Sequence, residues 1–206
     1  MSDQKIVSNI SIVGSKNAGK SSLIAAIVGA PVFPISKKNE THIPMSIVIS
    51  KDGTNSNAIK IAKAIQKSTL RNSYSDTSVL YDYPIKSVIG KSIITEYVGF
   101  GKDDNGKRSY NDFCKNIIKS DLILYVCDAN RLVLDNYDIK TIRTILEKIE
   151  HVRKTNHKNI ELFIVITKYD DENDIVLKNI CLPINKLTGV PKEKIYRINC
   201  YQALVS

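Results

Sequence analysis

Eight residues, GSKNAGKS at positions 14–21, constrain the fold of this chain more than any other stretch. They match the pattern GxxxxGK[ST], in which glycines let the backbone wrap closely around an anion and successive amides face it. The pattern works between a strand and a helix, because the helix N-terminus supplies further amides. An apolar run at residues 10–13 precedes the octet, and a helix-like stretch at residues 20–28 follows it. The sequence therefore predicts a strand, a phosphate-binding loop and a helix in that order.

The residues of the octet have separate expected parts in holding phosphates. The ammonium of Lys20 reaches the outer phosphates, and the hydroxyl of Ser21 coordinates Mg²⁺. The candidate nucleotide-binding residues here are Gly14, Ser15, Lys16, Asn17, Ala18, Gly19, Lys20, Ser21 and Ser22. The octet does not choose a base, so that choice needs a second motif.

Apolar runs rich in Ile and Val recur along the chain and are typical of strands buried on both faces. They lie at residues 10–13, 45–49, 92–98, 122–127, 162–166 and 195–198. Between them, helical spacing predicts helices at residues 20–28, 109–119 and 137–152. This alternation predicts an α/β fold with a mostly parallel central sheet flanked by helices.

A chain of 206 residues is long enough for one domain with a sizeable core, and no repeat or linker divides it. Residues 52–90 exceed a plain crossover, so we interpret them as an insertion with a helix near residues 58–65 and a Tyr-rich loop at residues 74–85. The sequence stops directly after the last predicted strand. We expect that the usual last covering helix is missing or that something else covers that face.

Charge and apolar content limit the classes of partner and the cellular location that we expect for this protein. The net charge is +9 and the pI is about 9.3, but the lysines are scattered and form no compact run with aromatics. Nucleic acid is therefore not expected as a partner. No apolar stretch is long enough to span a bilayer and the N-terminus lacks a signal-peptide layout, so we expect a cytoplasmic protein. Four widely spaced cysteines are expected to be buried thiols: Cys114, Cys127, Cys181 and Cys200.

A second motif follows the strand expected at residues 162–166. The sequence Thr167-Lys168-Tyr169-Asp170 resembles the [NT]KxD element of guanine-nucleotide-binding proteins. In that element the carboxylate accepts from the ring N–H and the amine of guanine, a donor pair that adenine lacks. A site built around such a pair rejects the base without it. GTP and GDP are therefore the predicted ligands, with Thr167, Lys168 and Asp170 near the base.

With both motifs in place, residues 10–201 resemble a P-loop GTPase of the translation-factor and dynamin-related class. The stretch GKSSLIAAIVGAPVFPIS, followed by THIP, is similar to the pattern of dynamin and related large GTPases. The resemblance implies a three-layer P-loop NTPase fold (G domain) that hydrolyses GTP with Mg²⁺. It also implies that Thr41 lies in the first switch, with its hydroxyl on Mg²⁺ and its amide near the γ-phosphate. We expect the neighbouring His42 to have no chemical role.

The end of the chain carries a weaker resemblance. Ile198-Asn199-Cys200 is similar to the short element that supplies a backbone N–H to the guanine oxygen. Asn199 and Cys200 are therefore candidate nucleotide-binding residues. Cys200 can equally be a packed core thiol.

The family's DxxG element is altered here. The stretch SIITEYVGFG places Glu96 and Gly99 where the aspartate and the glycine normally stand. Glutamate keeps the charge but adds a methylene, so it must fold back or displace the water that bridges to Mg²⁺. The resemblance implies that Ser21, Thr41 and Glu96 hold Mg²⁺ and that the amide of Gly99 senses the γ-phosphate. A formal DxxG at residues 103–106 lacks a preceding strand, and we interpret it as a loop turn.

Asn17 matches the asparagine of potassium-stimulated GTPases of the Era and tRNA-modification type. That resemblance implies that its side chain helps to hold K⁺ beside the phosphates and makes it a catalytic candidate with Lys20, Thr41 and Gly99. Lys16 could supply the charge directly, and Asn17 could equally form hydrogen bonds within the loop.

No glutamine follows Gly99, where Phe100 stands instead. We therefore expect slow hydrolysis without an activating protein or a G-domain dimer. Residues 128–131 approach a facing subunit in dynamin relatives, and here we interpret them as a capped loop. Glu96 keeps a second hypothesis open, a GTP-binding module with little or no hydrolysis. A P-loop kinase for a small molecule fits less well, because residues 167–170 would have no purpose in it. Membrane association is expected only through other regions or partners.

Overall fold

The computed structural model describes residues 8–28, 44–50, 79–84, 92–131, 135–168 and 177–200 of the chain. The strands are β1 Ser8–Gly14, β2 Met45–Ser50, β3 Val79–Pro84, β4 Ser92–Glu96, β5 Leu122–Asp128, β6 Glu161–Thr167 and β7 Ile195–Arg197. The α-helices are α1 Lys20–Val28, α3 Asp104–Asn116, α4 Asn136–Asn156 and α6 Leu182–Thr188.

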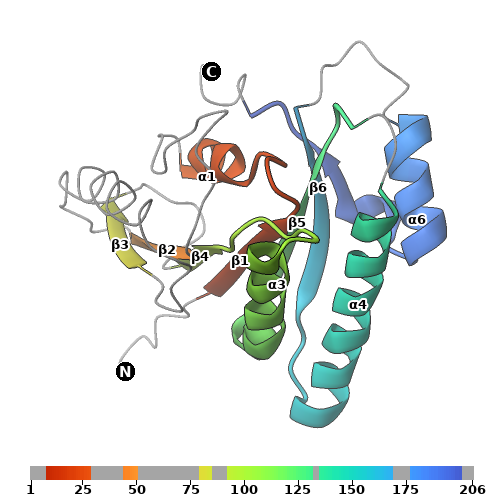
Figure 1. The fold of residues 1–206 in the computed structure, drawn as a ribbon. Helices are drawn as coiled ribbons and strands as arrows, with labels where there is room; N and C mark the ends of the chain where they lie inside the picture. Colours follow the sequence, from red (N-terminus) through yellow and green to blue (C-terminus); the bar gives the residue numbers. More distant parts are fainter. Residues whose placement is uncertain are drawn as a thin grey trace.

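The strands form one seven-stranded sheet in the order β3-β2-β4-β1-β5-β6-β7 (Figure 1). Every neighbouring pair is parallel except β2 and β4, which run antiparallel. The parallel pairs join through helices or long segments, as parallel strands require. The prediction of a mostly parallel α/β sheet is confirmed.

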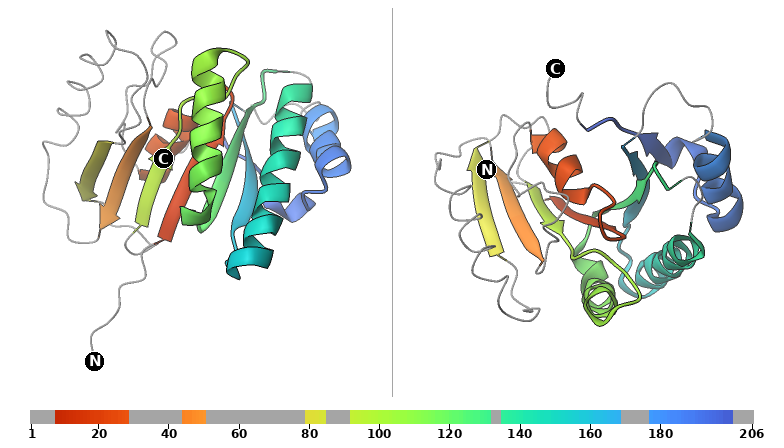
Figure 2. Two further views of the ribbon diagram at one scale, coloured as in Figure 1. Left: turned by 60° about the horizontal axis from the view of Figure 1, so that its bottom comes forward. Right: turned by 45° about the horizontal axis from the view of Figure 1, so that its top comes forward.

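Helices cover both faces of the sheet. Helix α1 lies on one face, and α3 and α4 lie on the other (Figure 2). Ile12 and Leu23 belong to the core on the α1 side, while Ile123 and Ile145 belong to the core on the α4 side. Strand side chains alternate between the two cores, which explains why the strands are apolar on both faces.

The six strands expected from the sequence are all present, with ends shifted by up to two residues. The helix expected at residues 20–28 matches α1, and the one expected at 137–152 lies inside α4. The helix expected at 109–119 starts earlier, as α3, and ends in a 3₁₀ turn at Ile117–Lys119. Apolar periodicity was therefore sufficient to place most of the sheet and its main helices.

The interpretation of residues 74–85 as a loop was wrong in part. Residues 79–84 form strand β3, which pairs in parallel with β2 from Met45↔Val79 to Ser50↔Pro84. Val79, Leu80, Tyr81 and Tyr83 all favour strands, and Pro84 is the last residue of the strand, where a missing donor costs little. The rest of the expected insertion, including the helix near residues 58–65, lies outside the described residues.

The interpretation of residues 103–106 as a loop turn was also wrong, because these residues begin α3. Asp103 is the N-cap residue, and its carboxylate accepts a hydrogen bond from the amide of Gly106. An aspartate is among the best N-cap residues, since it pairs with one of the unsatisfied amides of the first turn. The repeated acidic residues therefore mark a helix start.

Helix α6 was not predicted. Its seven residues follow a π-helical turn at Leu177–Cys181, and it ends at Gly189 in the left-handed conformation. A helix this short carries too little periodicity to stand out from a loop. In the described part of the chain, no helix has the length and apolarity needed to cross a membrane.

Candidate functional site

The predicted site residues gather where four neighbouring strands end. The phosphate-binding loop follows β1, Glu96 ends β4, Asp128 ends β5 and Thr167 ends β6. These strands are parallel neighbours in the sheet, so their carboxyl ends meet along one edge. Ligands of open α/β sheets bind at that edge. Segments up to about 150 residues apart therefore meet around the octet, as the bond between Ala18 and Thr167 shows.

The loop backbone is tightly wound. Asn17 has φ 59° and Gly19 has φ 92°. A Cβ at Gly19 would lie 2.7 Å from Oγ1 of Thr167, so the loop and the end of β6 are too close for any side chain at that position. The sixth residue of the octet is a glycine because of both the backbone angle and this contact.

Donors from outside the loop hold three successive carbonyls. The Lys16 carbonyl accepts from the Arg131 guanidinium at 3.0 Å, and the Asn17 carbonyl accepts from the Lys168 ammonium at 2.8 Å. The Ala18 carbonyl accepts from the Thr167 hydroxyl. Because a trans peptide points its N–H opposite to its C=O, carbonyls held outward turn the following amides inward. The amides of Asn17 and Gly19 would then face a phosphate in the loop, while the amide of Ala18 donates to the Ser15 carbonyl at 3.4 Å.

Lys20 is buried at the first turn of α1, with 5% of its surface exposed. Its ammonium donates to the carbonyls of Ser15 at 2.9 Å and Gly14 at 3.4 Å. These contacts fold the lysine side chain back over the loop. A buried ammonium in that place is matched to an anionic ligand lying in the loop.

Glu96 and Ser21 meet beside the loop. The Ser21 hydroxyl lies 2.9 Å and 3.0 Å from the two carboxylate oxygens of Glu96, whose residue is 1% exposed. Thus the longer arm of Glu96 reaches the serine directly. A hydroxyl and a carboxylate are oxygen ligands of the kind that Mg²⁺ takes, and this pair fits that ion.

A metal at this point would need ligands beyond the protein. Within the described residues, no three His, Cys, Asp or Glu side chains are grouped closely enough to hold a metal ion. Mg²⁺ sites commonly combine one or two protein oxygens with phosphates and water. The pair of Ser21 and Glu96 therefore suits an ion that arrives with a polyphosphate.

The segment after Glu96 runs along the loop. The Phe100 amide donates to the Gly14 carbonyl at 2.9 Å, and Phe100 forms a parallel bridge with Ser15. Gly99 lies directly against Lys16, since a Cβ there would be 2.6 Å from the Lys16 Cα. This contact explains why a glycine stands at that position. Because of this contact, a movement of the phosphate-binding loop would displace the segment after Glu96, and the reverse.

The side chain of Lys16 turns toward α3. Its ammonium donates to the Asp103 carboxylate at 2.8 Å, and this hydrogen bond lowers the pKa of Asp103 below its ordinary value. That Lys16 supplies charge at the phosphates stays a prediction. The ion pair links the loop to the N-terminus of α3.

A family model that describes 50S ribosome-binding GTPases matches residues 9–168, which include the octet, Glu96 and Thr167-Lys168. The chain belongs to this family. As a member of this family, it has the fold of a P-loop GTPase domain. No curated protein matches the chain.

Solved structures of Era share the fold of this family member. One is Era in complex with MgGDPNP and nucleotides of 16S ribosomal RNA, with 19% identity and a TM-score of 0.56. The other is an Era variant from Aquifex aeolicus bound to GDP and AlF4⁻, with 19% identity and a TM-score of 0.55. The alignments cover 97% of this chain but only 53% and 52% of the Era chains, so this chain spans about half their length. The likeness is to Era, and the expected likeness to dynamins finds no support here.

Some predicted residues of this GTPase lie outside the described residues, namely Thr41, His42, Tyr169 and Asp170. Asn199 is half-buried just beyond β7, and Cys200 is 7% exposed. The Cys200 thiol packs in the core on the α1 side, where burial raises its pKa. The reading of Cys200 as a packed core thiol is thus confirmed for its side chain.

Sequence reasoning missed a buried network below the loop. Asp138, near the start of α4, is 4% exposed and accepts hydrogen bonds at 2.6 Å from the hydroxyls of Ser15 and Tyr125. The Arg131 guanidinium lies 4.0 Å from the second carboxylate oxygen. Residues 128–131 do form a capped loop, because Asp128 accepts from the amide of Asn130. The sequence drew attention to that loop, but nothing in it indicated the contact of Arg131 with the phosphate-binding loop.

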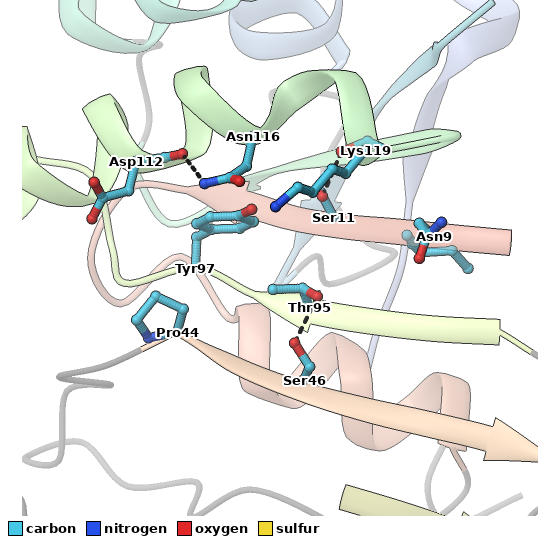
Figure 3. Close-up of a pocket in the computed structure, with 11 residues that line it drawn as sticks. Asn9, Ser11, Pro44, Ser46, Thr95, Tyr97, Asp112, Asn116 and Lys119 are labelled. Atoms are coloured by element: carbon cyan, nitrogen blue, oxygen red, sulfur yellow. Dashed lines mark hydrogen bonds between the residues drawn. The ribbon is translucent and has the colours of Figure 1, made fainter. Parts of the chain in front are cut away.

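A cavity of about 420 Å³ lies between α3 and the face formed by β1, β2 and β4 (Figure 3). Hydroxyl pairs line it, with Ser11 and Ser120 at 2.7 Å and Ser46 and Thr95 at 2.8 Å. Tyr97 forms part of the wall, and burial raises its pKa to about 12. The residue before it, Glu96, contacts Ser21, so β4 separates this polar cavity from the nucleotide site.

Proposed function

We propose that this chain is a G domain that hydrolyses GTP to GDP and phosphate with Mg²⁺ and acts as a conformational switch. The observation that supports it best is the contact between the Ser21 hydroxyl and the buried Glu96 carboxylate, beside the lysine-closed loop. When bound, Mg²⁺ would neutralise charge on the phosphates. Ser21 and Glu96 would hold it, with Thr41 as a third ligand. The loop amides and Lys20 would hold and neutralise the phosphates.

The second part of the proposal is the base. Lys168 lies against the phosphate-binding loop through its bond to the Asn17 carbonyl, which brings the [NT]KxD element next to that loop. Asp170 would accept from the N–H and amine groups of guanine, and the backbone at Asn199 and Cys200 would donate to the guanine oxygen. Replacing Asp170 with asparagine should shift preference from GTP to xanthosine triphosphate. Unchanged GTP affinity in that variant would contradict the base assignment.

The third part is the rate. Phe100 stands where a water-positioning glutamine could be, and it is 1% exposed and packed against Tyr110 and Phe113. A ring held in this way offers no polar group to a water molecule. We therefore propose slow hydrolysis that a partner protein or a second G domain accelerates, with Gly99 sensing the γ-phosphate.

Potassium is the proposed aid to this chemistry. Asn17 holds a left-handed backbone and has an exposed side chain at the rim of the loop. Its amide oxygen would help to hold K⁺ beside the phosphates, where the ion would offset charge in the way an arginine finger does. Equal hydrolysis rates in sodium and potassium would remove this role.

The deciding experiment is a single-turnover assay with Mg²⁺ and GTP, run in sodium and in potassium. Phosphate release by the wild type, lost in Lys20→Ala, would support the enzyme. If the wild type binds GTP but keeps it intact for hours, the protein is instead a GTP-binding module. The presence of Glu96 where the family pattern has an aspartate favours this second hypothesis. If GTP and ATP bind alike, or neither binds, the proposed function is wrong.

The remaining proposals concern the setting of the domain. We propose one G domain over residues 1–206, with an insertion at residues 52–90, and a cytoplasmic location. A membrane would be reached only through other regions or partners. The solved complex of Era with ribosomal RNA leaves our expectation against nucleic acid without support, and RNA binding should be measured beside the GTPase assay.

A further inference from the structure

The backbone of Asn17 is held from both sides by cationic side chains. Its φ of 59° is a left-handed conformation, which costs free energy in residues other than glycine although asparagine tolerates it better than most. The carbonyl before it, of Lys16, accepts from Arg131, and its own carbonyl accepts from Lys168. A strained residue persists where its surroundings fix it. Here the two flanking peptide groups are fixed by two separate donors.

Each of these donors is in turn anchored by an acid. The Lys168 ammonium pairs with Asp128 at 2.6 Å. Arg131 lies 4.0 Å from Asp138, which is fixed in place by the hydroxyls of Ser15 and Tyr125. Lys168 belongs to the base-recognition motif. Arg131 belongs to no motif, and its contacts connect the start of α4 to the phosphate-binding loop.

We propose that Arg131 and Asp138 are positioning residues that hold the phosphate-binding loop in the shape that receives a nucleoside triphosphate. The Lys16 carbonyl, held outward by Arg131, turns the Asn17 amide toward the interior of the loop. That amide lies next to Lys16, which contacts Gly99, the residue assigned to the γ-phosphate in the proposed function on which this inference rests. The pair of Arg131 and Asp138, which we call the clamp, therefore acts on the part of the loop that would face the terminal phosphate.

Geometry, rather than ion-pair strength, makes this arrangement effective. The Arg131 side chain is 42% exposed, and an exposed pair at 4.0 Å contributes little free energy by itself. Its guanidinium, however, offers several donors in one plane, so it can donate to the Lys16 carbonyl while it faces the buried carboxylate. Because Arg131 is not part of the core, its replacement should leave the fold intact.

The test compares Arg131→Ala with Arg143→Ala, a matched control. Arg143 is also an exposed arginine that donates to a backbone carbonyl, but that carbonyl belongs to Leu187 in α6 rather than to the loop. Asp138→Asn is the second variant, since it keeps the shape of the side chain and removes its charge. Kd is measured for MgGDPNP and MgGDP, and amide hydrogen exchange is measured over residues 14–20 in the nucleotide-free proteins.

We expect Arg131→Ala to weaken MgGDPNP about tenfold, the lower end for a bond to a charged donor, and MgGDP much less. Exchange over residues 14–20 should become faster in Arg131→Ala and Asp138→Asn and stay unchanged in Arg143→Ala. The inference is overturned if Arg131→Ala equals Arg143→Ala in both measurements, or if both nucleotides weaken equally. If the wild type binds neither nucleotide, the proposed function falls, and the exchange comparison still decides whether the clamp exists.

Discussion

Glu96 carries the largest departure of this chain from its family pattern, and its carboxylate still meets Ser21 at hydrogen-bond distance. We predict that Glu96→Gln weakens the Mg²⁺ dependence of nucleotide binding about tenfold, because an amide is a much poorer Mg²⁺ ligand than a carboxylate. Glu96→Asp should stay within a few-fold of the wild type, with a water bridging the missing methylene. The measurement is a Mg²⁺ titration of the nucleotide dissociation rate. Equal rates for Glu96→Gln and the wild type at every Mg²⁺ concentration would contradict the metal assignment.

Gly99 leaves no room for a side chain, since a Cβ would lie 2.6 Å from the Lys16 Cα and 2.8 Å from its amide nitrogen. Both atoms are backbone, so the loop itself would have to move. Gly99→Ala should weaken triphosphate binding about tenfold, in line with the cost of overpacking. Gly101→Ala is the control, because its nearest neighbour is a side-chain oxygen of Asp103 at 3.0 Å, which needs only a slight shift. Equal GTP affinities in the two variants would show that the approach of Gly99 to the loop is unimportant.

At the level of elements, the N-terminus of α3 is tied to the phosphate-binding loop by Asp103, which caps the helix and pairs with Lys16. The hydrogen bond from Lys16 lowers the pKa of Asp103. A lowered carboxyl pKa adds stability above the unfolded-state pKa, and this stability is lost as the pH falls through the folded-state pKa. Asp103→Asn, which keeps a capping oxygen, should therefore be less stable than the wild type at neutral pH. The difference should disappear well below about pH 4.

Urea unfolding at neutral and acidic pH measures this difference. Asp104→Asn is the matched control, because Asp104 is fully exposed and its partner Lys107 lies 3.9 Å away. If Asp103→Asn and Asp104→Asn have the same pH profile, the link between loop and helix contributes nothing to stability.

Elements with long apolar periodicity could be predicted from sequence, and short or capped ones could not. The buried strands β1, β5 and β6 read as continuous runs of Ile, Val and Leu, which follows from helices on both faces. Strand β3 was hidden inside a polar segment, and the start of α3 looked like a turn because acidic N-caps and turns share residue types. The octet and Thr167-Lys168 were recognisable because each is contiguous in sequence.

The hydrogen bonds of Asp138 could not be predicted from the sequence for a different reason. Asp138 and Ser15 are 123 positions apart, and their hydrogen bond arises only when α4 packs on the sheet face that it shares with α3. Ser15 stands in the octet, but Asp138 belongs to no contiguous pattern. Polar contacts of this kind depend on tertiary packing, which spacing along one chain does not encode.

At the scale of the whole molecule, the reactivity of the four thiols measures how often the two cores open to solvent. Cys127 is 4% exposed in the core on the α4 side, and Cys200 is 7% exposed in the core on the α1 side. Burial raises the pKa of both thiols, and that of Cys114 and Cys181 as well. The thiolate is the form that reacts, so little reaction is expected with the folded protein at neutral pH.

We predict that a variant with Cys127 as its single cysteine, made by Cys114→Ser, Cys181→Ala and Cys200→Ala, reacts with a thiol reagent only when the sheet opens. Cys127 sits in β5, an interior strand between β1 and β6, and packs in the core on the α4 side, so its exposure requires that helix layer to separate from the sheet. A ligand that binds the folded state alone reduces that opening by mass action. MgGTP at about one hundred times its Kd should slow the labelling about one hundredfold, which corresponds to roughly 2.7 kcal/mol, while MgATP should leave the rate unchanged. Labelling as fast as that of a small free thiol would contradict the buried position of Cys127. Equal protection by MgATP and MgGTP would show that recognition of guanine does not contribute to the stability of the fold.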